Sequence, residues 1–328
     1  MTDASIERTG RRAPLVRYFG WTMLFLLAAH QIANFLTVAY DFPGAFDAFS
    51  GGSAGAWTQL VLLLVALILP AVVVASSPDR SLRYEARRIS DFNAYLIRAF
   101  FFGVFFVGVA DAAIAFMRIE GMLVQFFPES VSVGLARASW TAMNVHVPLI
   151  VAGFVLALFT RSLGFVWLAL LIVVAELLIV ISRFVFSYEQ AFMGDLVRYW
   201  YAALFLFASA HTLLAEGHVR VDVLYSGFSE RAKGRANTFG TLLLGIVTAW
   251  TILYIGFDGP QSLINAPVRN FEISQSGPAG MYIKYQMAAF LGIFAATMLI
   301  QFVAYLFEAF ADWRDEPGRV ERDGTAAH

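Results

Sequence analysis

Eight long apolar segments constrain the fold of this chain more than any other feature of its sequence. A helix needs about 20 consecutive apolar residues to cross the hydrocarbon core of a bilayer. Soluble domains are about 45–50% apolar and about 25% charged, whereas this chain is 59% hydrophobic and 14% charged. The expected fold class is therefore an all-α polytopic membrane protein with about eight transmembrane helices, over residues 18–40, 57–76, 94–117, 141–160, 163–186, 195–215, 237–257 and 282–308.

The basic residues of the connecting loops predict the orientation of these helices. Cytoplasmic loops of membrane proteins are enriched in Lys and Arg. Of the 23 Lys and Arg residues, 17 lie in one alternating set of loops and adjoining helix ends, and this set includes both termini. The six on the opposite side are Arg118, Arg137, Arg183, Arg198, Arg269 and Lys284. Both termini are therefore expected to be cytoplasmic, in agreement with an even number of spans.

The spans fall into two groups of four. Residues 1–160 hold the first group and residues 161–310 the second, and the short turn between them predicts that the fourth and fifth spans form an antiparallel hairpin. The remaining residues, 311–328, are mostly polar and contain Pro317 and Gly318, which stop a helix. We expect this tail to be disordered and cytoplasmic.

Several classes of chemistry are excluded by the residues that the chain lacks. It has no cysteine, so disulfides, thiol nucleophiles and cysteine-ligated metal or iron–sulfur sites are ruled out. The sequence also has no Gly-rich phosphate loop, HExxH motif or GxSxG motif. These absences give no support to an enzyme.

Two charged residues in the fifth span need an explanation. Insertion of an ionisable side chain into a membrane costs about 2.5–3.5 kcal/mol, so such a residue is expected to have a partner or a function. Glu176 is expected near the middle of the membrane and Arg183 near its outer surface. Their spacing of seven residues places both on one face of a helix. They are predicted either to bind polar groups on neighbouring helices or to contact a partner subunit, and a transported-ion site is a third interpretation.

Other polar residues fall within or beside the spans. Asp195 and Arg198 have the i, i+3 spacing of a local ion pair at the outer start of the sixth span. Asp111 stands alone in the third span, where it is expected to face either a water-filled crevice or the first span. His30, Asn34 and Thr37 form a polar stripe along the first span. Hydrogen bonding between helices explains such a stripe, and contact with a substrate or a lipid headgroup is the alternative.

Three histidines raise a different class of function. Paired histidines on adjacent helices can ligate a b-type haem, and His30, His146 and His211 all lie within spans. The sequence does not show that any two of them lie at matched depth, so no cofactor is predicted.

A short amphipathic helix is expected after the sixth span. Val221, Leu224, Tyr225 and Phe228 recur at i, i+3, i+4 and i+7, and the charged residues that follow are Glu230, Arg231, Lys233 and Arg235. This pattern is typical of a helix that lies in the membrane interface. It is also compatible with a plain surface helix or with packing against a partner subunit.

Two short motifs in the second half, Arg183-Phe-Val-Phe186 and Gly217-His-Val-Arg-Val-Asp222, stand at the ends of expected helices. They resemble motifs of one family, the small permease subunits of TRAP (tripartite ATP-independent periplasmic) transporters. Arg183-Phe-Val-Phe186 resembles the sequence that ends the family's first helix, and Asp195 with Arg198 loosely resembles the start of its second helix. Gly217-His-Val-Arg-Val-Asp222 resembles the sequence that closes the second helix. The likeness covers about residues 163–308, so residues 1–160 are an N-terminal four-helix extension of that core.

The resemblance implies a transporter subunit in the inner membrane of a bacterium and not an enzyme. In this family a large permease subunit carries the substrate and Na⁺ sites, and a periplasmic binding protein delivers the solute, typically a carboxylate. The small subunit holds the large one in the membrane and helps to dock the binding protein. His218, Arg220 and Asp222 are then expected to fix the turn after the sixth span, and loops 187–195 and 258–281 to meet the binding protein.

Two alternatives belong to other classes of function. An independent carrier or channel would use Asp111, Glu176 and the polar stripe of the first span. A membrane redox protein would bind haem through two of the histidines.

Overall fold

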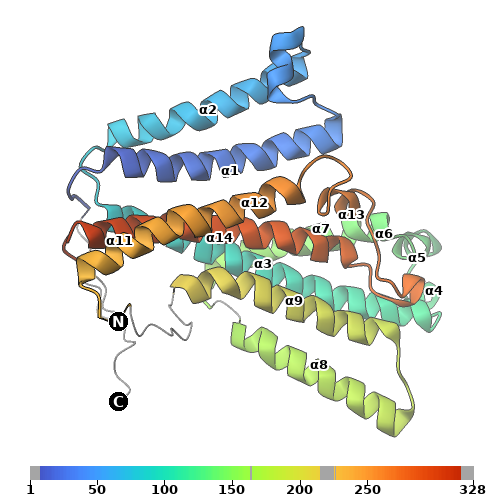
Figure 1. The fold of residues 1–328 in the computed structure, drawn as a ribbon. Coiled ribbons are helices and arrows are strands. Elements are labelled where there is room, and N and C mark those ends of the chain that lie inside the picture. The colour runs from blue at the N-terminus through green and yellow to red at the C-terminus, as the bar shows by residue number, and fades with distance from the viewer. Residues whose placement is uncertain (1–7, 163–164, 215–224, 226, 319–328) are drawn as a thin grey trace. The chain divides into compact units, whose positions relative to one another are not determined.

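The computed structural model describes residues 8–162, 165–214, 225 and 227–318, and in these ranges the chain is helical without a β-strand. Figure 1 shows the helices in chain order. The helices longer than eight residues are α1 (Pro14–Tyr40), α2 (Ala54–Ser76), α3 (Leu82–Ile119), α7 (Val147–Phe159), α8 (Phe165–Phe186), α9 (Ala191–Leu214), α11 (Glu230–Gly240), α12 (Val247–Gly256) and α14 (Lys284–Trp313). The shorter α-helices are α4 (Leu123–Phe126), α5 (Glu129–Leu135), α6 (Ala138–Thr141) and α13 (Asn265–Arg269). The other helical turns are η1 (Ala45–Ser50), η2 (Ala142–His146), η3 (Thr241–Ile246) and η4 (Gly277–Ala279).

The expected class, an all-α polytopic membrane protein, is confirmed. Within the described residues, seven helices are long and apolar enough to cross a membrane. Two of these are continuous through π-helical turns, Ala138–Phe159 through η2 and Glu230–Gly256 through η3. The expected sixth span corresponds to α9, which is 24 residues long and contains Asp195, Arg198 and His211. It is not among these seven helices.

By its internal contacts the chain divides into two compact units, and each takes residues from both halves of the sequence. Unit 1 comprises residues 1–93, 210–260 and 295–328, and unit 2 comprises residues 94–209 and 261–294. The first two helices, α1 and α2, run side by side as an antiparallel hairpin within unit 1 (Figure 1).

Ion pairs join separate segments at one end of unit 1. Arg17 at the start of α1 binds Glu85 of α3 through two hydrogen bonds of 2.9 and 2.7 Å, and only 0% and 2% of the two side chains is exposed. Arg83 binds Glu308 and Asp312 of α14 at 2.7 and 2.9 Å. These contacts explain why α3 begins well before its apolar part: its first polar side chains are buried against partners.

In unit 2 a close approach of two backbones joins α3 and α7. A Cβ atom on Gly153 of α7 would lie 2.5 Å from the backbone nitrogen of Gly103 on α3. Small residues at such crossings let membrane helices pack closely. Just before this contact, Pro148 has no N–H group for the helical ladder, and the chain forms the π-helical turn η2 there.

Two expectations about polar segments change with the structure. The tail was expected to be disordered from residue 311, but α14 continues to Trp313. Beyond it, the backbone oxygens of Glu316 and Pro317 accept hydrogen bonds from Arg83. Glu230, Arg231, Lys233 and Arg235 lie on α11, which continues into the following membrane helix and begins at the capping residue Ser229. Val221 and Leu224 of the expected amphipathic helix lie outside the described residues.

Candidate functional site

A continuous chain of hydrogen bonds runs through the interior of unit 2. Asp111 of α3 lies 3.2 Å from His146 Nε2, and His146 Nδ1 lies 2.9 Å from the hydroxyl of Tyr285. The Gln286 side-chain amide donates to the same hydroxyl at 3.0 Å, and Tyr199 of α9 donates to the Gln286 side-chain oxygen. One His146 tautomer gives every hydrogen bond of this chain a donor and an acceptor. In it the Tyr285 hydroxyl donates to Nδ1, and Nε2 donates to the Asp111 carboxylate.

Two buried carboxylates hold the segment that leads into α14. Asp111 accepts a hydrogen bond from the backbone nitrogen of Tyr282 at 2.7 Å, and Asp195 accepts one from Met281 at 3.1 Å. Arg118 donates to the carbonyls of Pro278 and Gly280 at 2.9 and 2.6 Å. Its guanidinium also lies 3.8 Å from the centre of the Tyr282 ring.

This buried arrangement serves to position a loop. Asp111, His146 and Tyr199 are fully buried, and a buried polar network is stable only when its members are paired. Both ring nitrogens of His146 are occupied, so this histidine has no nitrogen left to ligate a haem iron. The described residues also contain no group of three or more His, Asp or Glu side chains that could hold a metal ion.

Asp195 therefore has a role beyond the predicted pair with Arg198. The two side chains do approach, at 3.6 Å, but that of Arg198 is 72% exposed. A surface pair of this kind contributes little stability. The stronger interaction of Asp195 is the buried one with the backbone of Met281, 86 residues away in the sequence.

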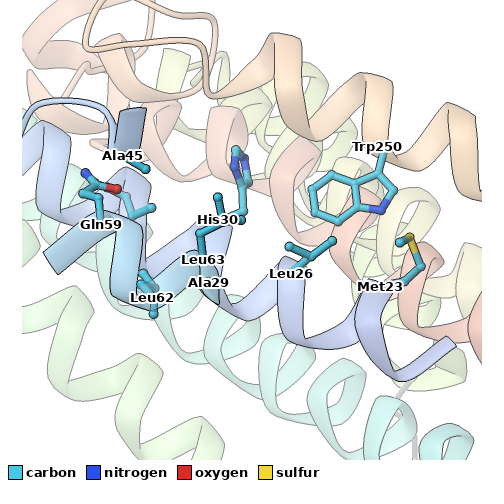
Figure 2. A pocket seen from close by; sticks show the side chains of 10 residues that line it. Met23, Leu26, Ala29, His30, Ala45, Gln59, Leu62, Leu63 and Trp250 are labelled. Carbon is cyan, nitrogen blue, oxygen red and sulfur yellow. The ribbon is translucent and has the colours of Figure 1, made fainter. Parts of the chain in front are cut away.

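The polar stripe of the first span lies beside a pocket of unit 1. The pocket has a volume of about 460 Å³ and is lined by α1, η1, α2 and α12. Figure 2 shows the His30 ring and the Trp250 indole projecting into it among apolar side chains. The His30 ring meets Trp250 and Phe257 edge to face, each with a centroid distance of 5.9 Å.

The other residues of this stripe and its surroundings contribute contacts between helices. Gln59 of α2 donates to the Thr37 hydroxyl at 2.8 Å, which joins α1 to α2. Asn34 is half-buried on the same helix. His211 is half-buried near the end of α9. His30 is the one histidine among the residues that line the pocket, so the pocket does not bring two histidines together around a ligand.

Glu176 differs from the other intramembrane carboxylates. It lies near the middle of α8, on an exposed side of the helix. No hydrogen bond or ion pair joins it to any residue that the structure describes. Arg183, seven residues later, pairs with Glu189 at 3.2 Å, and these side chains are 60% and 54% exposed.

Two hydrogen-bonded pairs outside the membrane helices contain a group with a shifted pKa. The hydrogen bond from Arg12 lowers the pKa of Asp79, and the two side chains lie 2.5 Å apart. Burial and the hydrogen bond to Glu120 raise the pKa of Tyr188 to about 12.

The remaining predicted site residues cannot be placed. Gly217, His218, Arg220 and Asp222 lie outside the described residues. In turn, the sequence did not point to Tyr199, Tyr285 or Gln286, which complete the network around His146. Polar residues at the start of the last span were the available signal, but an aromatic residue there is equally typical of membrane anchoring.

The described helices thus define a multi-pass membrane protein with buried polar clamps. Residues 170–312 match the family model described as tripartite ATP-independent periplasmic transporters, DctQ component. That part of the chain is similar to the DctQ component, the small permease subunit of TRAP transporters, and residues 1–169 precede the matched region. No curated protein and no solved structure matches the chain at a significant level.

Proposed function

We propose that this chain scaffolds the large permease subunit of a TRAP-type secondary transporter in the bacterial inner membrane. The complex would import a small carboxylate solute together with Na⁺, after a periplasmic binding protein delivers the solute. The observation that carries this proposal is the DctQ match over residues 170–312. The exposed apolar surface of α8, which lies within that region, supports a role in assembly.

The proposal assigns a part to each region of the chain. Residues 161–310 form the four-helix small-permease region, and residues 1–160 extend it by four helices. Both termini face the cytoplasm. Gly217, His218, Arg220 and Asp222 fix the turn after the sixth span, and the loop clamped by Asp111 and Asp195 contributes to transient docking of the binding protein.

Affinity purification from native membranes tests the assembly. The tagged chain, extracted in mild detergent, is expected to bring with it a second, very hydrophobic protein in a fixed ratio. Arg220→Ala and Asp222→Ala are expected to lower that recovery while leaving membrane insertion unchanged. Recovery of the tagged chain alone would contradict the proposal.

A transport assay separates the subunit from an independent carrier. Vesicles that contain only this chain are expected to take up no solute, whereas vesicles with both permease subunits and the binding protein should show Na⁺-dependent uptake. Uptake by the isolated chain would instead support a carrier.

A further inference from the structure

The middle of α8 carries a carboxyl group for which the described chain offers no partner. Glu176 lies eleven residues after the start of the helix and ten before its end. At a rise of about 1.5 Å per residue, it is about 15 Å from either end. A carboxyl group at this depth is too far from the ends of the helix for its side chain to reach water at the membrane surface.

The surroundings of Glu176 on α8 are apolar and open. Three side chains of the helix, Leu168, Ile172 and Ala175, are buried in unit 2. Beside Glu176, Val173 and Val180 are 63% and 48% exposed. These two residues and Arg183 lie at i−3, i+4 and i+7 from Glu176, so the four side chains form one stripe along the helix.

Asp111 and Asp195 show how this chain treats a carboxylate that it pairs internally. Both are buried, and both accept hydrogen bonds from backbone N–H groups of unit 2. Glu176 has neither property, although it is placed deeper along its helix than Asp195 is along α9. A polar group left in lipid without a partner is unfavourable, so the partner is expected to come from another chain.

We propose that the stripe of Val173, Glu176, Val180 and Arg183 is an intramembrane docking surface for the large permease subunit, and that Glu176 pairs there with a basic side chain on a transmembrane helix of that subunit. This inference rests on the proposed function. A basic group is the match because it satisfies both the charge and the hydrogen-bonding capacity of a carboxylate. Apolar contacts of the two valines would exclude lipid around the pair.

Co-purification of Glu176 variants tests the charge. Glu176→Leu leaves the basic group of the large subunit unpaired, and we expect about tenfold lower recovery of that subunit. Glu176→Gln keeps an acceptor oxygen and should recover an intermediate amount. The matched control is Val174→Leu, on another exposed side of α8, with recovery unchanged. Because Glu176 has no partner within the described residues, the Glu176→Leu chain produced alone should insert and remain monodisperse as well as the wild type.

Cross-linking tests the surface itself, because the chain contains no cysteine. A photo-reactive maleimide attached to Glu176→Cys or Val180→Cys should cross-link to the large subunit. The same reagent on Val174→Cys or Ile181→Cys, which point away from the stripe, should yield no protein product.

The outcomes distinguish the two proposals. If the wild-type chain recovers no large subunit, the proposed function fails and this inference fails with it. If wild type and Glu176→Leu recover equal amounts, only the docking surface is overturned. Cross-links from position 176 to a second copy of this chain, or from positions 174 and 181 to the large subunit, would also overturn it.

Discussion

Several buried side chains of this protein bind backbone groups as well as other side chains. Asp111 joins α3 to both His146 and the amide of Tyr282. Such an interaction fixes a loop more rigidly than a surface ion pair does, because the loop backbone has no rotamers to exchange. The stability of the loop before α14 is therefore expected to depend on a few buried acceptors.

Asp111→Ala is expected to destabilise the purified protein strongly. The substitution leaves the Tyr282 amide and the His146 ring without their acceptor in a buried site, at a cost of about 1–3 kcal/mol for each unsatisfied group. Thermal unfolding in detergent would measure the loss.

Arg198→Ala serves as the control for this variant. Arg198 is exposed and its contact with Asp195 is 3.6 Å long, so we expect a change within about 0.5 kcal/mol. An equal loss of stability in both variants would contradict the role of the buried acceptor.

The contacts of single residues were the part of the structure that the sequence predicted least well. Hydropathy places Asp111 in a membrane helix and marks it as unusual. Its partners are 35 and 171 residues away, and no periodicity of the sequence relates these positions. Asp195 was predicted to pair with its neighbour Arg198, which is correct as a contact, but the buried bond to Met281 was not predictable.

Whole helices were predicted more accurately, because an apolar run long enough to cross a bilayer has few alternatives to a helix. The apolar part of each helix agrees with the sequence, and α1, α2 and α8 end at the expected residues, but several other helix ends do not agree. A hydropathy profile places the start of a helix at the edge of its apolar run. The helix α3 begins earlier, because Arg83 and Glu85 in its first turn both have ion-pair partners. The capping serine at residue 229 likewise extends the next membrane helix back to Glu230.

The close packing of α7 against α3 predicts the effect of a substitution at Gly153. A Cβ atom there would lie 2.5 Å from Gly103 N and 3.1 Å from Ala99 O, both backbone atoms that cannot rotate away. Gly153→Ala should therefore force α7 from α3 and cost about 1–3 kcal/mol, as other overpacked cores do. The measurement is the midpoint of thermal unfolding in detergent.

The matched control lies across the same contact. A Cβ atom on Gly103 would lie 3.5 Å from its nearest neighbour, which is an ordinary contact distance. Gly103→Ala is expected to leave the unfolding temperature nearly unchanged. If Gly103→Ala were the more damaging of the two, the crossing geometry would be wrong.

At the scale of the whole molecule, the basic segments bear on topology. Within unit 1, Arg314 donates to the backbone oxygens of Arg11 and Arg12, while Arg12 pairs with Asp79 and Arg231 with Asp315. These contacts join the N-terminal segment, the turn between α2 and α3, the start of α11 and the end of α14. Segments in contact lie on one side of a membrane, and the sequence had placed the same four on the cytoplasmic side by their excess of Lys and Arg.

The two ends of α2 allow this orientation to be tested with conservative changes. Ser50 precedes the helix and Ser76 ends it, and both are exposed. With the N-terminus in the cytoplasm, a single cysteine in place of Ser50 faces the periplasm and one in place of Ser76 faces the cytoplasm. A membrane-impermeant maleimide should therefore label Ser50→Cys in intact spheroplasts, and Ser76→Cys only after lysis. The reverse pattern would invert the topology and place the joined basic segments on the periplasmic side. That result would contradict the orientation predicted by the positive-inside rule.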